Sequence, residues 1–150
     1  SACYTVAMSE ASSDKSSPSK EQFSQIIERQ EGIIEPYKDE KFITNVNVAR
    51  ADAFRYYLAS IETGFLAQLI HGPEMDDEER DITQRNLSED LEAVQAVANG
   101  DWLPIRNLLL SNSDEYRKNG ELEVSMRISA GTANLEKAEA LKRMAGLLEA

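Results

Sequence analysis

Apolar residues recur at helical spacing in the middle of the chain. Between residues 54 and 69 they lie three or four positions apart and therefore share one face of a helix: Phe54, Leu58, Ile61, Phe65 and Leu69. Asn45 or Asn47 can cap the start of this helix, and Gly72-Pro73 is a typical end. The pattern predicts an amphipathic helix over residues 47–71, with the stripe packed in the core.

A shorter helix is predicted before it. Phe23, Ile26, Ile27 and Ile34 follow roughly helical spacing, Ser19 with Gln22 resembles a capping box, and Pro36 stops the run. These signals predict a helix over 20–34. The residues before it are rich in serine and nearly free of apolar side chains, so we expect residues 1–18 to form a flexible arm, or an extended arm that lies on a partner.

The acidic segment after Pro73 has a less regular pattern. Leu87, Leu91, Val94 and Ala98 share one face, whereas Ile82 lies off that face. We expect helix over 76–99, with either a kink near 86–88 or a new start at Ser88. Asn99-Gly100 is a typical helix end.

The last third of the chain predicts two further helices. Asp101 can cap a helix that carries Pro104 in its first turn, and residues 111–114 suggest a break or bulge. Residues 121–129 alternate apolar and polar side chains, which is typical of a strand; because the neighbouring segments are helical, we favour helix over 101–128 and keep the strand as the alternative. A regular apolar stripe predicts a final helix over 132–149: Leu135, Ala138, Leu141, Ala145 and Leu148.

Together these elements predict an all-α protein. We expect an up-down four-helix bundle with an extra N-terminal helix, in a single domain over residues 19–150. No apolar run reaches the length of about 18 residues that a membrane span requires.

Charge is concentrated in one part of the chain. The formal net charge is −11, and residues 74–101 hold ten acidic against two basic residues, a net of −8. Such a field disfavours nucleic-acid backbones and anionic lipids as ligands and favours a basic protein partner. Acids are also favoured in the first turn of a helix by its dipole. The residues predicted to dock on a partner are Asp76, Asp77, Glu78 and Glu79, with Tyr56 and Tyr57 as interface anchors if they are exposed.

The sequence holds few residues for catalysis or metal binding. His71 is the only histidine and Cys3 the only cysteine, so a Cys/His zinc site or a paired Glu-x-x-His iron site lacks ligands. No glycine motif for phosphate binding is present. We therefore expect no enzyme, no cofactor and no metal.

One stretch resembles a known family. Residues 87–128 contain Gly100-Asp101-Trp102, then Ile105-Arg106, then Gly120, Leu122 and Met126, and an amphipathic segment follows up to 148. This resembles the second half of the PsbQ-like family, the extrinsic lumenal subunits of photosystem II. The resemblance implies a four-helix bundle without cofactor, docked on a photosynthetic membrane complex in the plastid thylakoid lumen. Glu123 stands where the family usually has arginine, which puts a basic docking face there in doubt.

The expected function is therefore a non-enzymatic accessory or docking subunit of a larger assembly, and the resemblance implies that this assembly is a photosynthetic one. Outside that resemblance we expect a soluble intracellular protein. Two alternatives stay open. An acidic decoy that imitates DNA should spread acid over most of its surface, whereas residues 102–150 are neutral, with seven acids and seven bases. A viral or phage assembly adaptor should form a closed ring of identical subunits.

Overall fold

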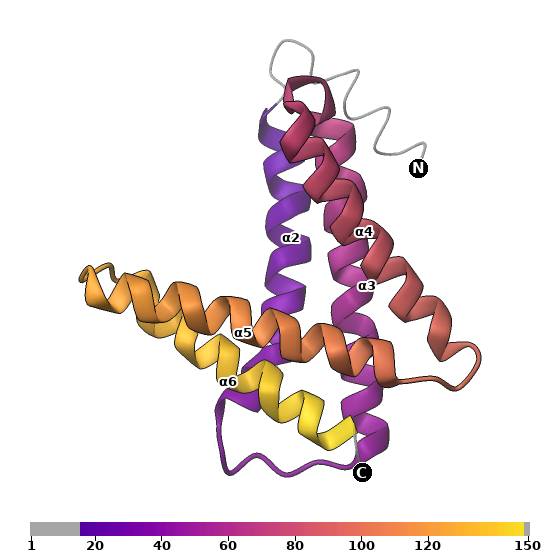
Figure 1. Ribbon diagram of the computed structural model, residues 1–150, viewed down its shortest axis with the longest axis vertical. Helices are drawn as coiled ribbons and strands as arrows, with labels where there is room; N and C mark the ends of the chain where they lie inside the picture. The colour runs from indigo at the N-terminus through magenta and orange to yellow at the C-terminus, as the bar shows by residue number, and fades with distance from the viewer. Residues whose placement is uncertain (1–15, 149–150) are drawn as a thin grey trace.

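The computed structural model describes residues 16–148 and contains five α-helices joined by short connections (Figure 1). They are α2 (Ser16–Ile34), α3 (Val46–His71), α4 (Asp77–Val97), α5 (Leu103–Ser125) and α6 (Ala130–Leu148), with short 3-10 helices at Glu35–Lys38 and Gly72–Glu74. Residues 16–148 contain no strand. The all-α fold with one helix preceding four others is thus confirmed. Most of the predicted arm lies outside the described residues, and α2 begins three residues before the predicted cap at Ser19.

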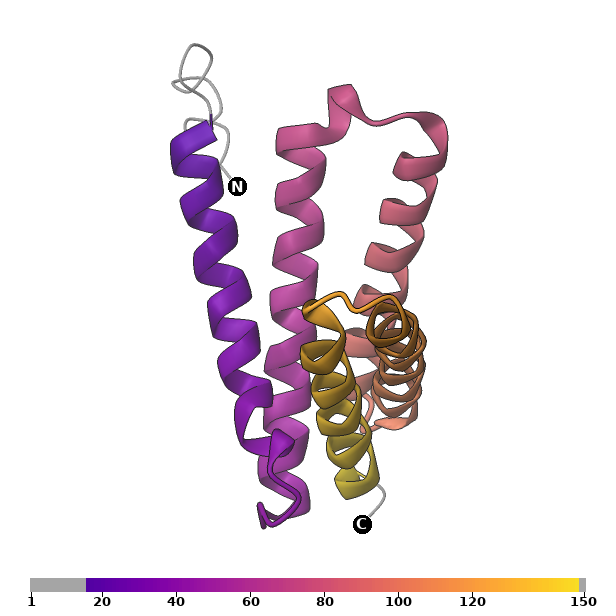
Figure 2. The ribbon, with the colours of Figure 1, turned by 90° about the vertical axis from the view of Figure 1, so that its left-hand side faces the viewer.

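The helices form a layer and a hairpin. α2, α3 and α4 run side by side with alternating direction (Figure 2). α5 and α6 pack closely on each other as a hairpin that lies across the lower part of this layer and projects beyond it on one side (Figures 1 and 2). Consecutive helices reverse direction within the layer and within the hairpin, whereas α5 crosses α4 instead of running antiparallel to it, so the last pair departs from an up-down arrangement (Figures 1 and 2).

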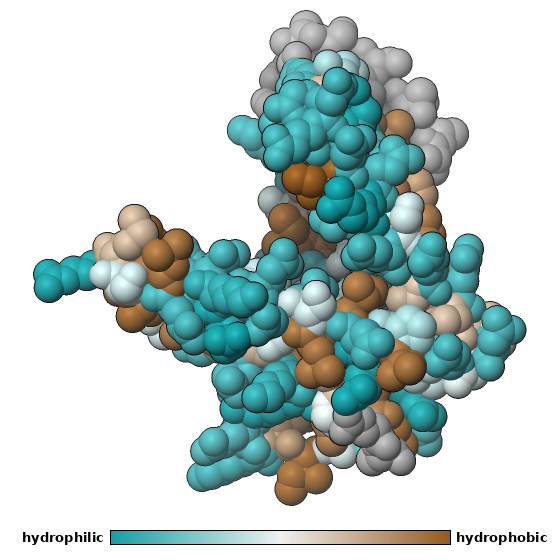
Figure 3. Space-filling view, in the orientation of Figure 1, coloured by the Kyte–Doolittle hydropathy of each residue, from teal (hydrophilic) through white to brown (hydrophobic). Residues whose placement is uncertain are grey.

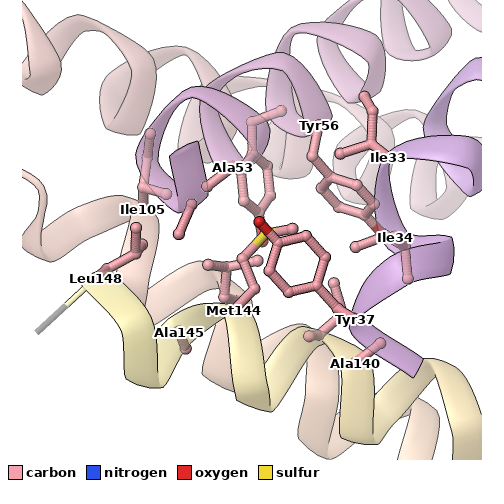
Figure 4. Packing of buried hydrophobic residues seen from close by; sticks show 14 of the residues in the cluster. Ile33, Ile34, Tyr37, Ala53, Tyr56, Ile105, Ala140, Met144, Ala145 and Leu148 are labelled. Carbon is pink, nitrogen blue, oxygen red and sulfur yellow. The ribbon is translucent and has the colours of Figure 1, made fainter. Parts of the chain in front are cut away.

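The main core lies where the hairpin crosses the layer (Figure 4). Large side chains from α2, α3, α5 and α6 are fully buried there, among them Ile34, Tyr57, Leu109 and Met144. Alanines on α3 and α6 let the crossing helices approach closely: Ala49, Ala53, Ala140 and Ala145. Burial of this apolar surface supplies most of the favourable free energy of folding.

The turn after α2 is tied to this core by polar contacts. The Tyr37 hydroxyl donates a hydrogen bond to Asp52 Oδ2 across 2.6 Å, and burial raises the pKa of this phenol well above its usual range. The Arg143 guanidinium donates to the backbone carbonyl oxygens of Tyr37 and Lys38 at 2.8 and 3.1 Å. The 3-10 turn is therefore held from both α3 and α6.

The predicted core stripe of α3 is largely on the outside, which corrects the sequence prediction. Leu58, Phe65 and Leu69 remain 38%, 46% and 37% exposed, while Ile61 is buried and Phe54 is partly buried against the main core. The residues that α3 buries against its neighbours are mainly small or tyrosine: Ala49, Ala53, Tyr56, Tyr57 and Ala59. Because α3 is the middle helix of the layer, it has buried residues on several faces.

Two helices continue where the sequence suggested an interruption. α4 is one helix through residues 86–88, so a new start at Ser88 is wrong, and Ile82, which lies off its apolar face, is exposed. α5 continues through residues 111–114, because the polar side chains there have partners on other helices: Ser113 Oγ donates to the Ala138 carbonyl oxygen at 2.6 Å, and Asn112 bonds to α3. The preferred helical prediction for 121–125 is confirmed, since α5 ends at Ser125.

Two helices end in the same capping geometry. After α4, the amides of Gly100 and Asp101 donate to the carbonyl oxygens of Val97 and Ala96, with Gly100 at φ 74°. After α5, the amides of Arg127 and Ile128 donate to the carbonyl oxygens of Val124 and Glu123, with Arg127 at φ 58°. Both are Schellman ends, which require a residue in the left-handed region. Glycine occupies that position in the first and arginine in the second.

Candidate functional site

The predicted docking acids lie together at the start of α4. We call Asp76, Asp77, Glu78 and Glu79 the acidic turn. Asp76 is the N-cap and accepts the Glu79 amide hydrogen at 2.8 Å through Oδ1. All four residues are exposed, and Figure 3 shows a mostly hydrophilic surface where α4 begins, at the top of the view. Capping and the helix dipole account for acids at these positions, and their exposure leaves them free for a partner.

Arginine compensates little of this charge. Arg80 lies 3.3 Å from Asp77 Oδ1, whose side chain is fully exposed. The same guanidinium donates to the backbone carbonyl oxygens of Gly72 and Met75. Arg80 therefore fixes the turn between α3 and α4, and most of the negative charge stays unpaired.

The two predicted tyrosine anchors are buried, so neither ring is available to a partner in this structure. Tyr56 and Tyr57 are 3% and 0% exposed, and their rings meet edge to face with centroids 5.2 Å apart. They belong to the face of α3 that the hairpin covers. In the sequence the two tyrosines lie between Phe54 and Leu58 of the apolar stripe, and this spacing does not show which face of α3 another helix covers.

A polar groove lies where α2, α3, α4 and α5 meet. It encloses a hollow of about 360 Å³ and continues into a smaller one of about 270 Å³ that shares Gln30, Ser60, Asn86 and Asp90. The larger hollow is lined mostly by polar side chains from four helices, namely Gln30, Tyr56, Ser60, Asn86, Glu89, Asp90, Leu108, Asn112, Glu115, Tyr116 and Asn119. We call this set of residues the polar groove.

Negative charge in the polar groove is not neutralised locally. Glu89, Asp90 and Glu115 line the hollow, and no basic residue is among its described lining. Asp90 takes part in no hydrogen bond or ion pair with the residues whose side chains are described. Burial, together with the neighbouring Glu89 carboxylate, raises the pKa of Asp90 to about 7.

The phenol of Tyr56 is a second unusual group in the polar groove. Its side chain is almost fully buried, yet its hydroxyl has no hydrogen-bond partner within the described part of the chain. Burial raises the pKa of Tyr56 well above its usual range, so the phenol stays neutral at physiological pH. The backbone beside it is held by Gln30, whose Nε2 donates to the Tyr56 carbonyl oxygen at 3.2 Å and to Ser60 Oγ at 2.7 Å.

The nearby cation, Lys137, is already engaged. Its Nζ lies 4.4 Å from the ring centroid of Tyr116 and 3.1 Å from Glu31 Oε1, and its side chain is mostly buried. It thereby connects α6 to α5 and α2 behind the groove, and does not line the hollow. The charge of Lys137 is consequently directed to Glu31 rather than to Asp90.

Other candidate chemistry is absent from the described residues. His71 lies at the end of α3, half exposed, with Nδ1 4.0 Å from Glu74 Oε2 and its ring stacked on Phe23. No group of three or more histidine, cysteine, aspartate or glutamate residues in the described part could hold a metal ion. None of the described helices is both long and apolar enough to cross a membrane.

Comparison of the chain with protein families, with curated proteins and with solved structures finds no match.

The polar groove was not predicted from the sequence. Its residues come from four helices and have no common spacing, so no local pattern marks them. The available signal was weaker: Gln30, Ser60 and Asn112 are polar residues beside apolar positions of their helices, and Asp90 belongs to the acidic segment. Tyr56 was singled out as an interface anchor if exposed, and the structure buries it.

Proposed function

We propose that this protein is a non-enzymatic docking subunit that binds a basic surface of a larger assembly through its acidic turn. The observation that carries the proposal is the exposure of Asp77, Glu78 and Glu79 at the end of the helical layer. Only Arg80 lies within ion-pair distance of them in the described structure. Exposed charge of one sign accelerates encounter with a complementary surface and fixes its orientation.

A finer proposal is that this assembly is a photosynthetic membrane complex. It rests on the resemblance of residues 87–148 to the PsbQ-like family. In the structure Gly100 ends α4 in the left-handed conformation, Asp101 accepts the Leu103 amide at 3.1 Å, and Trp102 takes the N-cap position of α5. Arg50 lies 5.4 Å from the centroid of the Trp102 ring. Capping and packing of helices account for all these contacts, so the contacts alone do not distinguish this family from other helical proteins. Gentle extraction of the native protein, followed by a measurement of chlorophyll in the complex, tests the proposal.

Charge reversal tests the docking role. The variant Asp77→Lys, Glu78→Lys, Glu79→Lys reverses three exposed acids and leaves the N-cap Asp76 in place, since loss of a cap costs about 1 kcal/mol. We expect the variant to fold with native helicity by circular dichroism and to be lost from the assembly that the wild-type protein joins. Wild-type binding should weaken as salt rises from 0.05 to about 0.5 M, because screening shortens the reach of exposed charges.

A second variant with the same change in net charge serves as the control. Glu28, Glu136 and Glu139 are exposed acids on α2 and α6, away from the acidic turn. Replacing all three by lysine should leave assembly unchanged. If both triple variants lose assembly equally, net charge rather than the acidic turn is responsible, and if neither loses it, the docking role is wrong.

A further inference from the structure

Hydrogen-bond acceptors outnumber free donors in the polar groove. The carboxylates of Glu89, Asp90 and Glu115 only accept hydrogen bonds when ionised. The amide donors are partly occupied, since Gln30 Nε2 bonds to Tyr56 and Ser60, and Asn112 Nδ2 bonds to the Tyr57 hydroxyl. The groove is therefore complementary to a ligand that brings its own N–H donors and a positive charge.

Tyr56 provides a further open acceptor in the groove. Its side chain is 3% exposed and lines the hollow, and its hydroxyl has no hydrogen-bond partner among the described residues. This hydroxyl is not one of the fully enclosed unpaired atoms of the described residues, so it is open to the hollow and can bond to a group that binds there. Helix capping explains the acidic turn, but it explains neither this phenol nor Asp90, which lies in the interior of α4.

The size and layout of the hollow narrow the class of ligand. About 360 Å³ is at the lower end of the range for small-molecule sites. The three carboxylates line the hollow from two helices, Glu89 and Asp90 from α4 and Glu115 from α5. An ammonium group directs its three N–H bonds to separate acceptors, whereas a guanidinium prefers two parallel bonds to a single carboxylate.

We propose that the polar groove binds a primary alkylammonium group, with the Asp90, Glu89 and Glu115 carboxylates neutralising its charge and the Tyr56 hydroxyl accepting one of its N–H bonds. Two sources carry this chemistry, a lysine side chain of another protein and a free polyamine. The site is distinct from the acidic turn, so it goes beyond the docking proposal and can hold if that proposal fails.

The charged groups around Asp90 set the pH at which the site is active. Glu89 lies beside it on α4, Tyr56 and Tyr57 face the region from α3, and Glu115 and Tyr116 line the groove from α5. α2 contributes the uncharged Gln30, while Glu31 and Lys137 pair with each other and influence Tyr56. Because the pKa of Asp90 is about 7 and an alkylammonium keeps its charge to about pH 10, binding should strengthen between pH 6 and 8.

Titration calorimetry of the full chain tests the proposal with two ligands, spermidine and Nα-acetyl-lysine methylamide, whose side-chain ammonium is free. Nα-acetyl-norleucine methylamide is the uncharged analogue. We expect saturable binding of at least one amine, with a dissociation constant of about 1 mM or below, and none of the norleucine compound. Asp90→Asn should weaken binding about tenfold and Tyr56→Phe about threefold, as expected for loss of a charged and a neutral hydrogen bond.

The matched control is Glu92→Gln, which removes one exposed carboxylate of α4 outside the groove. It should leave binding within about twofold of wild type, as should the triple reversal of the acidic turn, apart from screening-dependent effects. Saturable binding of the lysine compound identifies a lysine side chain as the source, and binding of spermidine alone identifies a free polyamine. A response that is not saturable, or that falls equally in Asp90→Asn and Glu92→Gln, overturns the proposal.

Discussion

Asn112 on α5 donates a hydrogen bond from Nδ2 to the hydroxyl oxygen of Tyr57 on α3, across 2.9 Å. Tyr57 is fully buried, so this bond satisfies a polar group inside the core where the hairpin meets the layer. The neighbouring Tyr56 hydroxyl has no such partner among the described residues. The hydroxyl groups of these two adjacent tyrosines should therefore contribute differently to the stability of the folded protein.

Removing each hydroxyl should therefore have a different effect on stability. Tyr57→Phe leaves the Asn112 amide without its acceptor and should lower the free energy of unfolding by about 1–2 kcal/mol. Tyr56→Phe removes a hydroxyl that bonds to no described residue and should change stability by less than about 0.5 kcal/mol. Urea unfolding followed by circular dichroism measures both. Equal destabilisation by the two substitutions would contradict the assignment.

Asp90 should make stability depend on pH. Its pKa in the folded protein is about 7, raised from 3.8, so the folded state holds the proton more tightly than the unfolded state. The contribution is most favourable below pH 4 and is lost as pH rises through 7. Asp90→Asn removes this titration, and we expect it to stabilise the protein at pH 8 by about 1 kcal/mol, a figure reduced for solvent screening of a half-buried group.

The comparison is made by measuring unfolding of wild type and Asp90→Asn at about pH 3 and at about pH 8. At about pH 3 the carboxyl is mostly protonated in both the folded and the unfolded state, because both pKa values lie above that pH, so the two proteins should be equally stable there. A variant that is no more stable than wild type at pH 8 would show that the Asp90 carboxylate is well solvated.

The arginine at the end of α5 is expected to be suboptimal. Arg127 has φ 58° and makes no ion pair with the described residues. A left-handed conformation costs about 1–2 kcal/mol for a residue with a Cβ, and the greater freedom of unfolded glycine offsets part of that. Arg127→Gly should therefore raise the free energy of unfolding by about 0.5 kcal/mol.

Gly100 provides the matched comparison, because it occupies the same position after α4 with φ 74° and has nothing within 4 Å of an added Cβ. Gly100→Ala should lower stability by about 1 kcal/mol through backbone strain alone. If both substitutions leave the thermal midpoint unchanged, the two left-handed positions carry no strain.

Close contact between α5 and α6 depends on glycine. A Cβ at Gly131 would lie 2.7 Å from the Val124 backbone nitrogen and 3.0 Å from the Gly120 carbonyl oxygen. Gly131→Ala should force the helices apart and cost about 2–3 kcal/mol. Gly146 on α6 has free space around its Cβ position, so Gly146→Ala should stabilise the helix by about 0.5–1 kcal/mol. Thermal unfolding of both variants tests the contrast, and similar effects would contradict it.

Local signals predicted most of the helices. The run of apolar positions from Phe54 to Leu69 indicated α3, and Asn45 caps it as expected, accepting the Val48 amide at 2.9 Å. The same run misplaced the core, because spacing shows which residues share a face and not which face a neighbouring helix covers. On α3 the alanines and tyrosines are covered, while Leu58 and Phe65 are half exposed.

Contacts between distant helices explain the remaining differences. Ser113 suggested a break because polar residues are unfavourable inside a buried helix without a partner, and its partner is the Ala138 carbonyl oxygen on α6. The polar groove likewise brings Gln30, Ser60, Asp90 and Asn112 together from four helices. Only the crossing of the hairpin over the layer creates these neighbours.

The contacts of α6 also set an order of events during synthesis. Arg143 bonds to Tyr37, and Lys137 pairs with Glu31, in each case across a separation of 106 residues. During synthesis α2, α3 and α4 leave the ribosome before α6. The alanine and tyrosine side chains that α6 covers in the folded protein therefore stay exposed to solvent until α6 follows. The nascent chain therefore completes its core only after α6 has emerged, and chaperones that bind apolar surface can bind it before that point.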